Sequence, residues 1–244
     1  MTYCVAIKVD DGIVLASDSR TNAGVDYIRT YSKLHIFNWA GDRTIIILAS
    51  GNLATTQAVI NNIHHDLDNE SDHFNLRKAK HLFEVAHYIG SLNQKEQQEH
   101  SKAFNDKRES LEANFIVGGQ IGTQEDDIYL IYPEGNYITV SPETPYMQIG
   151  ETKYGKPILD RIITGETSLD DAARCALVSL DSTMRSNISV GPPLELAIYK
   201  VDSLAEPRYC KIDLSTEMFI DLQEGWAEGI QQAFKNLPKF EWEQ

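Results

Sequence analysis

The chain has 244 residues, a length that fits one large domain with a full core. Its 22 lysines and arginines stand against 36 aspartates and glutamates, and the net charge of −14 argues against nucleic acids and anionic membranes as partners. The longest apolar run, Ile45–Ala49, is far too short to span a bilayer.

The N-terminal part of the chain is predicted to form strands. Residues 3–9 and 13–16 flank Asp10-Asp11-Gly12, a turn sequence that suits a tight hairpin. Both faces of this hairpin carry apolar side chains, so we expect a sheet that is covered on both sides. Further strands are predicted at residues 27–31, 34–37 and 44–49.

The middle of the chain changes to a helical period. Apolar residues recur at helical spacing over 53–67 and again over 79–92, which predicts two consecutive helices. The stretch 93–112 is polar and rich in Gln, Glu and Lys, and it either extends the second helix or forms an insertion.

The C-terminal half repeats this order of strands and helices. Strands are predicted at 114–119, 128–132 and 137–140, helices at 155–163 and 168–180, and strands again at 194–201 and 209–212. An amphipathic pattern over 225–237 predicts a terminal helix or a partner-facing appendage.

This alternation favours an α+β fold in which two stacked antiparallel sheets lie between two helical layers. No internal repeat or low-complexity linker interrupts the chain, so we expect one domain over residues 1–244, with the extension at about 93–112 and the C-terminal helix at about 225–237.

Thr2 is the first candidate for chemistry. It would become the first residue if Met1 were removed, a step that a small second side chain permits. A free N-terminal threonine carries its own base, because its α-amine has a pKa of about 7.7–8.0 and can accept the hydroxyl proton. Threonine is nevertheless common after an initiator methionine, so Thr2 alone is weak evidence.

Charged residues near the predicted hairpin strengthen this hypothesis. Asp18 and Arg20 lie two residues apart in an extended segment and so share a face, which is a geometry for an ion pair. Lys33 comes just before a strand, where its charge could lower the pKa of the threonine hydroxyl or carry its proton. Solvated charges at strand ends are the alternative interpretation.

The sequence resembles the proteasome β-subunit and HslV-like family, and within it the bacterial branch called Anbu, or ancestral β-subunit. The segments that carry the resemblance are Thr2–Lys8, Asp11–Arg20, Ala23-Gly24, Lys33–Ile36, Ser50–Ala54 and Gln148–Gly155.

The resemblance implies a four-layer αββα sandwich of the N-terminal nucleophile hydrolases and a threonine-type peptidase that forms an acyl-enzyme. Carried over to this chain, it implies that Thr2 is the nucleophile, that Asp18 and Lys33 form a supporting ion pair and that Gly51 donates to the oxyanion. It further implies that Ser189 is a catalytic serine and that Arg20 supports the catalytic residues without contacting the substrate. Ala49 and Leu53 flank Gly51, and we expect them to line an apolar substrate pocket.

Three positions depart from the family pattern. Lys33 is one residue nearer to Asp18 than usual, Glu151 stands where a serine is usual, and Ser186 replaces an aspartate. The last two departures favour an alternative, a catalytically weak scaffold that self-assembles into a ring or helical stack. Another alternative keeps the enzyme but makes it a hydrolase of small amides.

The resemblance further implies a homo-oligomer that takes a peptide or unfolded protein as substrate, with an unidentified regulator or ATPase as a possible partner. No cofactor and no metal are expected: His81 and His87 are six residues apart on a helix and face different sides.

The three cysteines are widely spaced, which fits a reducing compartment. The first residues show no targeting pattern, so the expected location is the cytoplasm.

Overall fold

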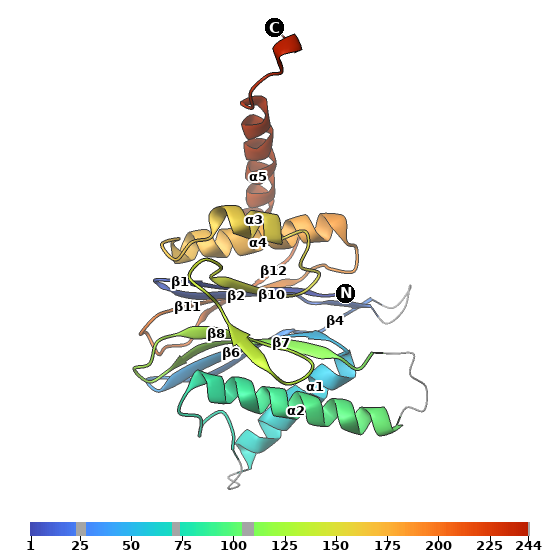
Figure 1. Cartoon of the computed structure of the whole chain (residues 1–244), viewed down its shortest axis with the longest axis vertical. Coiled ribbons are helices and arrows are strands. Elements are labelled where there is room, and N and C mark those ends of the chain that lie inside the picture. Colours follow the sequence, from blue (N-terminus) through green and yellow to red (C-terminus); the bar gives the residue numbers. More distant parts are fainter. Residues whose placement is uncertain (23–27, 70–73, 104–109, 244) are drawn as a thin grey trace.

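A computed structural model describes residues 1–22, 28–69, 74–103 and 110–243 and shows four layers, helices on sheet on sheet on helices (Figure 1). Ala23-Gly24 of the family resemblance and residues 104–109 of the predicted polar extension lie outside the described residues.

Two five-stranded sheets, antiparallel throughout, form the middle of the sandwich. The first has the order β10-β1-β2-β11-β12 and consists of β1 (Tyr3–Val9), β2 (Gly12–Asp18), β10 (Tyr146–Gly150), β11 (Leu194–Lys200) and β12 (Arg208–Ile212). The second is a meander of β5 (Leu34–Trp39), β6 (Arg43–Gly51), β7 (Ala113–Ile121), β8 (Asp127–Ile131) and β9 (Tyr137–Thr139). Beside them, β3 (Arg20–Asn22) and β4 (Ile28–Thr30) form a short ribbon.

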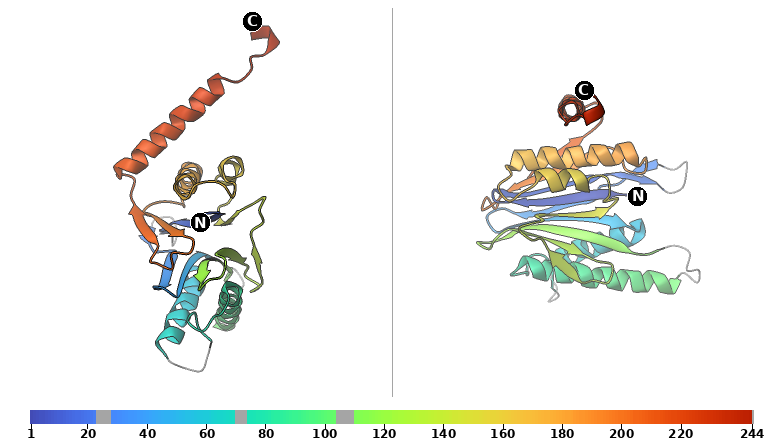
Figure 2. Two further views of the ribbon diagram at one scale, coloured as in Figure 1. Left: turned by 90° about the vertical axis from the view of Figure 1, so that its left-hand side faces the viewer. Right: turned by 45° about the horizontal axis from the view of Figure 1, so that its top comes forward.

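Helices cover the outer face of each sheet (Figure 1). The second sheet carries α1 (Leu53–Asp68) and α2 (Leu82–Ala103), and the first carries α3 (Lys156–Ile162) and α4 (Leu169–Ser186). A fifth helix, α5 (Glu217–Lys235), leaves the sandwich and projects away from it, followed by a short 3-10 turn at Glu241–Glu243 (Figure 2). None of the helices in the described ranges is both long and apolar enough to cross a bilayer.

The alternation of β1 explains the layering. Tyr3, Val5 and Ile7 are fully buried in the core under α3 and α4, whereas Cys4 and Ala6 are fully buried in the core between the two sheets. A third apolar core lies between the second sheet and the helices α1 and α2. Because the apolar residues on both faces of β1 are buried, the prediction of an α+β sandwich with two covered sheets is confirmed.

Some element boundaries differ from the predictions. Helix α2 continues through the polar stretch as far as Ala103, and α5 begins at Glu217 rather than at residue 225. Gly225 and Gly229 lie inside α5, where glycine weakens the local signal for a helix. Strand β10 was missed, because this five-residue edge strand alternates poorly in burial and follows Pro142 and Pro145.

Candidate functional site

A cavity of about 710 Å³ lies at the N-terminal end of β1. Its walls come from the start of β1, the end of β6, the first turns of α1 and the segment before β5. Five of the residues that the sequence singled out line this cavity together: Thr2, Lys33, Ala49, Gly51 and Leu53. They come from three separate segments, residue 2, residue 33 and residues 49–53, which the fold brings to the same end of the sandwich.

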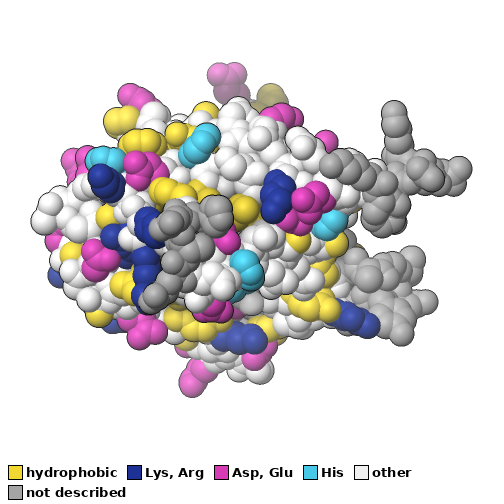
Figure 3. All heavy atoms as spheres, turned by 90° about the horizontal axis from the view of Figure 1, so that it is seen from below, with side chains coloured by type: hydrophobic (Ala, Val, Ile, Leu, Met, Phe, Trp, Pro, Cys, Tyr) yellow, Lys and Arg dark blue, Asp and Glu magenta, His cyan; other side chains and the backbone are white. Residues whose placement is uncertain are grey.

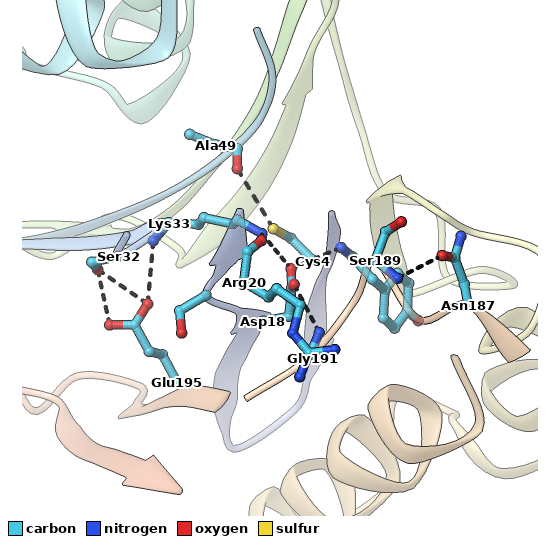
Figure 4. A network of polar contacts seen from close by, with 12 residues as sticks. Cys4, Asp18, Arg20, Ser32, Lys33, Ala49, Asn187, Ser189, Gly191 and Glu195 are labelled. Carbon is cyan, nitrogen blue, oxygen red and sulfur yellow. Dashed lines mark hydrogen bonds and ion pairs between the residues drawn. The ribbon is translucent and has the colours of Figure 1, made fainter. Parts of the chain in front are cut away.

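Asp18 is fully buried at the end of β2, next to the strand that begins after Thr2. Its carboxylate accepts hydrogen bonds from the backbone N–H of Tyr3 at 3.0 Å and of Gly191 at 3.2 Å, and from the Lys33 ammonium at 2.7 Å (Figure 4). Asp18 therefore joins three parts of the chain: the residue after Thr2, the loop before β11 and the segment before β5.

Lys33 is held at both ends. Its Nζ donates to Asp18 Oδ1 and to the carbonyl of Arg20, each at 2.7 Å, and its carbonyl accepts the N–H of Ala49 at 3.0 Å. Burial raises the pKa of the Asp18 carboxyl, and the Lys33 charge and the hydrogen bonds oppose that rise. Lys33 and Asp18 thus form a buried ion pair, in which each charge compensates the cost of burying the other.

Arg20 does not have the role in an ion pair with Asp18 that their spacing suggested. Its guanidinium donates to the carbonyl of Ile188 at 2.7 Å, and a Cβ at Gly191 would lie 2.3 Å from the guanidinium carbon. Lys33 pairs with Asp18 instead, because Asp18 ends β2 and Arg20 opens a new strand that turns toward β4.

Two glycines in the cavity wall allow close approaches of the backbone, Gly150 to the start of β1 and Gly51 to the start of β7. Gly150 has φ +87°, and a Cβ there would lie 1.9 Å from the Thr2 carbonyl oxygen. Gly51 has φ +110°, and its Cβ would lie 2.3 Å from the carbonyl oxygen of Glu112. Both positions therefore require glycine, for conformation and for space.

Ser189 lies in the loop after α4 and is tied to Glu151 through one side chain. Asn187 accepts the N–H of Ser189 at 3.0 Å and donates to the Glu151 carboxylate at 3.0 Å, while the Glu151 N–H donates to the Thr2 carbonyl at 2.7 Å. Ser186, by contrast, is exposed and bonds within its own helix. The hydrogen-bond partner of the Glu151 carboxylate is thus Asn187, a residue that the sequence pattern did not indicate, and the Lys153 ammonium lies 4.0 Å from the other carboxylate oxygen.

The sequence pattern also gave no indication of Glu195, whose carboxylate belongs to this site. Glu195 on β11 is 2% exposed, and its carboxylate lies beside Ser32 and the backbone of Lys33 (Figure 4). A buried glutamate in an otherwise apolar strand was the available signal, since such a group is rarely retained without partners.

Cys4 lies near the pair but is a poor candidate for a nucleophile. It is fully buried, its Sγ is 3.7 Å from the carbonyl oxygen of Ala49, and burial raises the pKa of its thiol, so the thiolate is disfavoured. In the part of the chain that the structure describes, no cluster of histidine, cysteine and carboxylate side chains is arranged to hold a metal ion.

Known proteins resemble this chain along most of its length. The proteasome subunit family matches residues 2–199. Among proteins with curated descriptions, none matches.

Three solved structures are similar over nearly their whole length. Anbu (ancestral beta-subunit) from Yersinia bercovieri is 40% identical, with a TM-score of 0.91 and coverage of 98% of this chain and 99% of that one. A structure that shows the helical assembly of the Anbu complex from Pseudomonas aeruginosa is 41% identical, with a TM-score of 0.91 and coverage of 98% of both chains. A mutant of Anbu from a Hyphomicrobium species is 39% identical, with a TM-score of 0.90 and coverage of 99% of this chain and all of that one.

These matches confirm the resemblance and the N-terminal nucleophile hydrolase fold. The family match spans most of the chain, and the identity extends over nearly all of it. The chain therefore belongs to the proteasome family and, within it, to the group of Anbu proteins.

Proposed function

We propose that this protein is a threonine-type peptidase whose nucleophile is Thr2 after removal of Met1. The observation that carries the proposal is that Lys33, which lines the same cavity as Thr2, forms a buried ion pair with Asp18 behind the cavity wall. Burying two charges is costly, and an arrangement of this kind next to a hydroxyl nucleophile is typical of a catalytic site.

The reaction follows from the groups at this end of the sandwich. The Oγ of Thr2 attacks the carbonyl carbon of the scissile amide, and its proton passes to the free α-amine of the same residue. The amide nitrogen then leaves with that proton, and the acyl group remains on Thr2 as an ester. Water hydrolyses the ester, which releases the acid and restores the hydroxyl.

Three neighbouring residues have separate tasks in this mechanism. The Lys33 ammonium stabilises negative charge that develops on the Thr2 oxygen, and Asp18 keeps that ammonium in place. The N–H of Gly51 donates to the oxyanion of the tetrahedral intermediate, a task for which a backbone group on a rigid strand end is well suited.

The cavity supports a peptide substrate with an apolar side chain. Ala49, Leu53 and Ile60 supply apolar wall on one side, while Gln57 and Asn61 supply amide groups that can bind a peptide backbone. A small amide would leave much of a cavity of about 710 Å³ unfilled.

Intact-protein mass spectrometry with a peptide epoxyketone tests the proposal, because this electrophile requires both the hydroxyl and the free amine of a terminal threonine. We expect a mass that lacks Met1 and then a single adduct. Thr2→Ala should abolish the adduct, and Thr21→Ala, which changes another threonine that lines the cavity, should retain it.

Absence of an adduct on a chain that has lost Met1, with peptide and short-amide substrates both uncleaved, would contradict the peptidase and favour the scaffold. Faster cleavage of short amides than of peptides would keep Thr2 as the nucleophile and change the substrate class.

We also infer that the protein self-assembles. The outer part of α5 and the turn after it expose Ile230, Phe234, Leu237, Phe240 and Trp242, each at least half exposed. Such a row is unusual on an isolated chain and indicates an association surface. The opposite face, over α1 and α2, mixes its apolar side chains with charged ones (Figure 3).

The occupant of this surface is a second copy of the chain. The relative from Pseudomonas aeruginosa forms a helical assembly, and it aligns with 98% of this chain. Assembly and catalysis are compatible, so the scaffold hypothesis is distinguished only by the adduct at Thr2.

A further inference from the structure

We propose that Glu195 is a positioning residue that fixes the backbone of Lys33 and so places its ammonium in the catalytic site. This inference rests on the proposed function, since it concerns the rate at which Thr2 reacts. Neither the sequence pattern nor the resemblance to the family pointed to Glu195.

The carboxylate of Glu195 bridges two layers of the sandwich. Glu195 lies on β11 in the first sheet, and residues 32–33 lead into β5 of the second. Its Oε2 accepts the backbone N–H of Lys33 at 3.2 Å (Figure 4). The Ser32 Oγ, with its one proton, lies 2.8 Å from Oε1, 3.1 Å from Oε2 and 2.8 Å from the carbonyl oxygen of Leu34. Tyr209 on β12 donates to Oε1 at 2.7 Å.

These contacts fix the backbone of Lys33, while Asp18 fixes its ammonium group. The donors to Glu195 named above are neutral, so the carboxylate remains in the interior through hydrogen bonds to a peptide N–H and two hydroxyls. A buried carboxylate is costly unless its lone pairs are satisfied, and here the donors order the segment that carries Lys33.

The geometry of Lys33 makes it sensitive to this support. Its ammonium accommodates both the Asp18 carboxylate and the Arg20 carbonyl at 2.7 Å, which leaves little freedom at the tip. If the backbone N–H lost its acceptor, residues 32–33 would shift, and the ammonium would move relative to Thr2. Misplacement of about 1 Å in a catalytic site lowers rates by up to about 100-fold.

Two substitutions of similar size show whether Glu195 acts through its hydrogen bonds to the Lys33 segment or through its negative charge. Glu195→Met fills the same space without an acceptor, and we expect the maximal rate of epoxyketone labelling to fall by about 10- to 100-fold while the inhibitor concentration for half-maximal rate changes little. Glu195→Gln retains an oxygen for the Lys33 N–H, and its amide can donate to the hydroxyls of Ser32 and Tyr209. We expect its labelling rate to stay within about threefold of the wild type.

A matched control distinguishes positioning from a general loss of structure. Glu96 on α2 is also buried, at 6% exposure, and accepts a hydrogen bond from Asn62 at 2.9 Å. Glu96→Met should lower the melting temperature as Glu195→Met does, yet leave the labelling rate unchanged. Equal losses of rate in the two variants would overturn the proposal.

The decisive measurement repeats these substitutions in a Lys33→Ala background, with removal of Met1 verified by mass. If Glu195 acts through Lys33, Glu195→Met has no further effect on the residual labelling there. An equal fold-loss in both backgrounds, or a loss in Glu195→Gln as large as in Glu195→Met, would overturn it. Failure of the wild-type protein to label would instead contradict the proposed function, so the two failures are distinguishable.

Discussion

Charged side chains usually lie at the surface and large apolar side chains in the interior. The end of the sandwich around Thr2 departs from this pattern by burying charges, and the projecting helix α5 departs from it by exposing apolar side chains. Near Thr2, the charged side chains of Asp18, Lys33 and Glu195 are all less than 9% exposed, in a region where apolar residues would be more stable. On α5, Ile230 and Phe234 are 50% and 73% exposed, where polar residues would be more soluble.

Each departure indicates a different kind of function. Buried charges that hydrogen-bond to their neighbours keep a fixed geometry, which a catalytic group needs in order to act on one atom of a substrate. Exposed apolar side chains gain free energy only when another surface covers them, which is useful for association. Substitutions at the Thr2 end should therefore change rates, whereas those on α5 should change assembly.

Among variants that keep Thr2, the largest effect is expected from Lys33→Ala. It removes the positive charge from the wall of the cavity that Thr2 lines, so, if Thr2 is the nucleophile, the rate of epoxyketone labelling should fall by about 10²- to 10⁴-fold. It also leaves Asp18 buried without its partner, and the free energy of unfolding should fall by about 3–5 kcal/mol. Labelling kinetics and urea unfolding measure the two effects.

Lys8→Ala is the matched control for that substitution. Lys8 pairs with Glu125 at 3.0 Å and lies 3.9 Å from Asp127, and the Glu125 side chain is 84% exposed. The loss of this pair should cost less than about 1 kcal/mol and leave the labelling rate unchanged. Similar losses of rate in both variants would mean that Lys33 has no special place in the reaction.

A smaller but still large effect is expected from Gly51→Ala. The added Cβ would lie 2.3 Å from the Glu112 carbonyl oxygen, so the strand end must move and the N–H of residue 51 with it. We expect labelling to fall by about 10²- to 10³-fold, the usual effect of losing one oxyanion donor.

Gly41→Ala is the control for Gly51→Ala, because it introduces the backbone strain of a positive φ without a steric clash. Gly41 also has positive φ, at +80°, but nothing lies within 4 Å of its Cβ position. This variant should lose about 1 kcal/mol of stability and label normally. Normal labelling by Gly51→Ala as well would remove Gly51 from the mechanism.

On α5, Phe234→Glu should act on assembly alone. Burial of one phenylalanine contributes about 1.5–3 kcal/mol, so the dissociation constant between copies should rise by about 10- to 100-fold. Analytical ultracentrifugation measures the assembly, and Gln231→Glu adds the same charge at an exposed polar position as a control. An unchanged size distribution for Phe234→Glu would show that the surface binds something else.

The sequence was sufficient to predict the layers, because β1 alternates apolar residues that all proved to be buried. That signal is local and repeats with the period of the strand. The expectation that Thr2, Lys33 and Gly51 belong to one site came instead from the resemblance to the family, and the structure places all three in the wall of one cavity.

The missed features depend on contacts between distant parts of the chain. Glu195 is separated from Lys33 by 162 positions, and Asn187 from Glu151 by 36, so no local pattern connects either pair. The two-residue spacing predicted that Arg20 lies beside Asp18. The chain leaves the sheet after Asp18, however, and the Arg20 guanidinium hydrogen-bonds to the carbonyl of Ile188. Side-chain partners across layers require the tertiary structure.

The smallest expected effect concerns the pH dependence of stability at His35, another residue in the wall of the cavity. Burial lowers the pKa of the His35 imidazole, whereas the unfolded chain retains a value near 6.5. As the pH falls below about 6.5, the unfolded state takes up a proton that the folded state excludes, so the free energy of unfolding decreases, by at most about 1.4 kcal/mol per pH unit. His35→Asn should flatten this part of the profile in urea unfolding between pH 8 and pH 5, and an identical slope in both proteins would show that His35 contributes nothing to it.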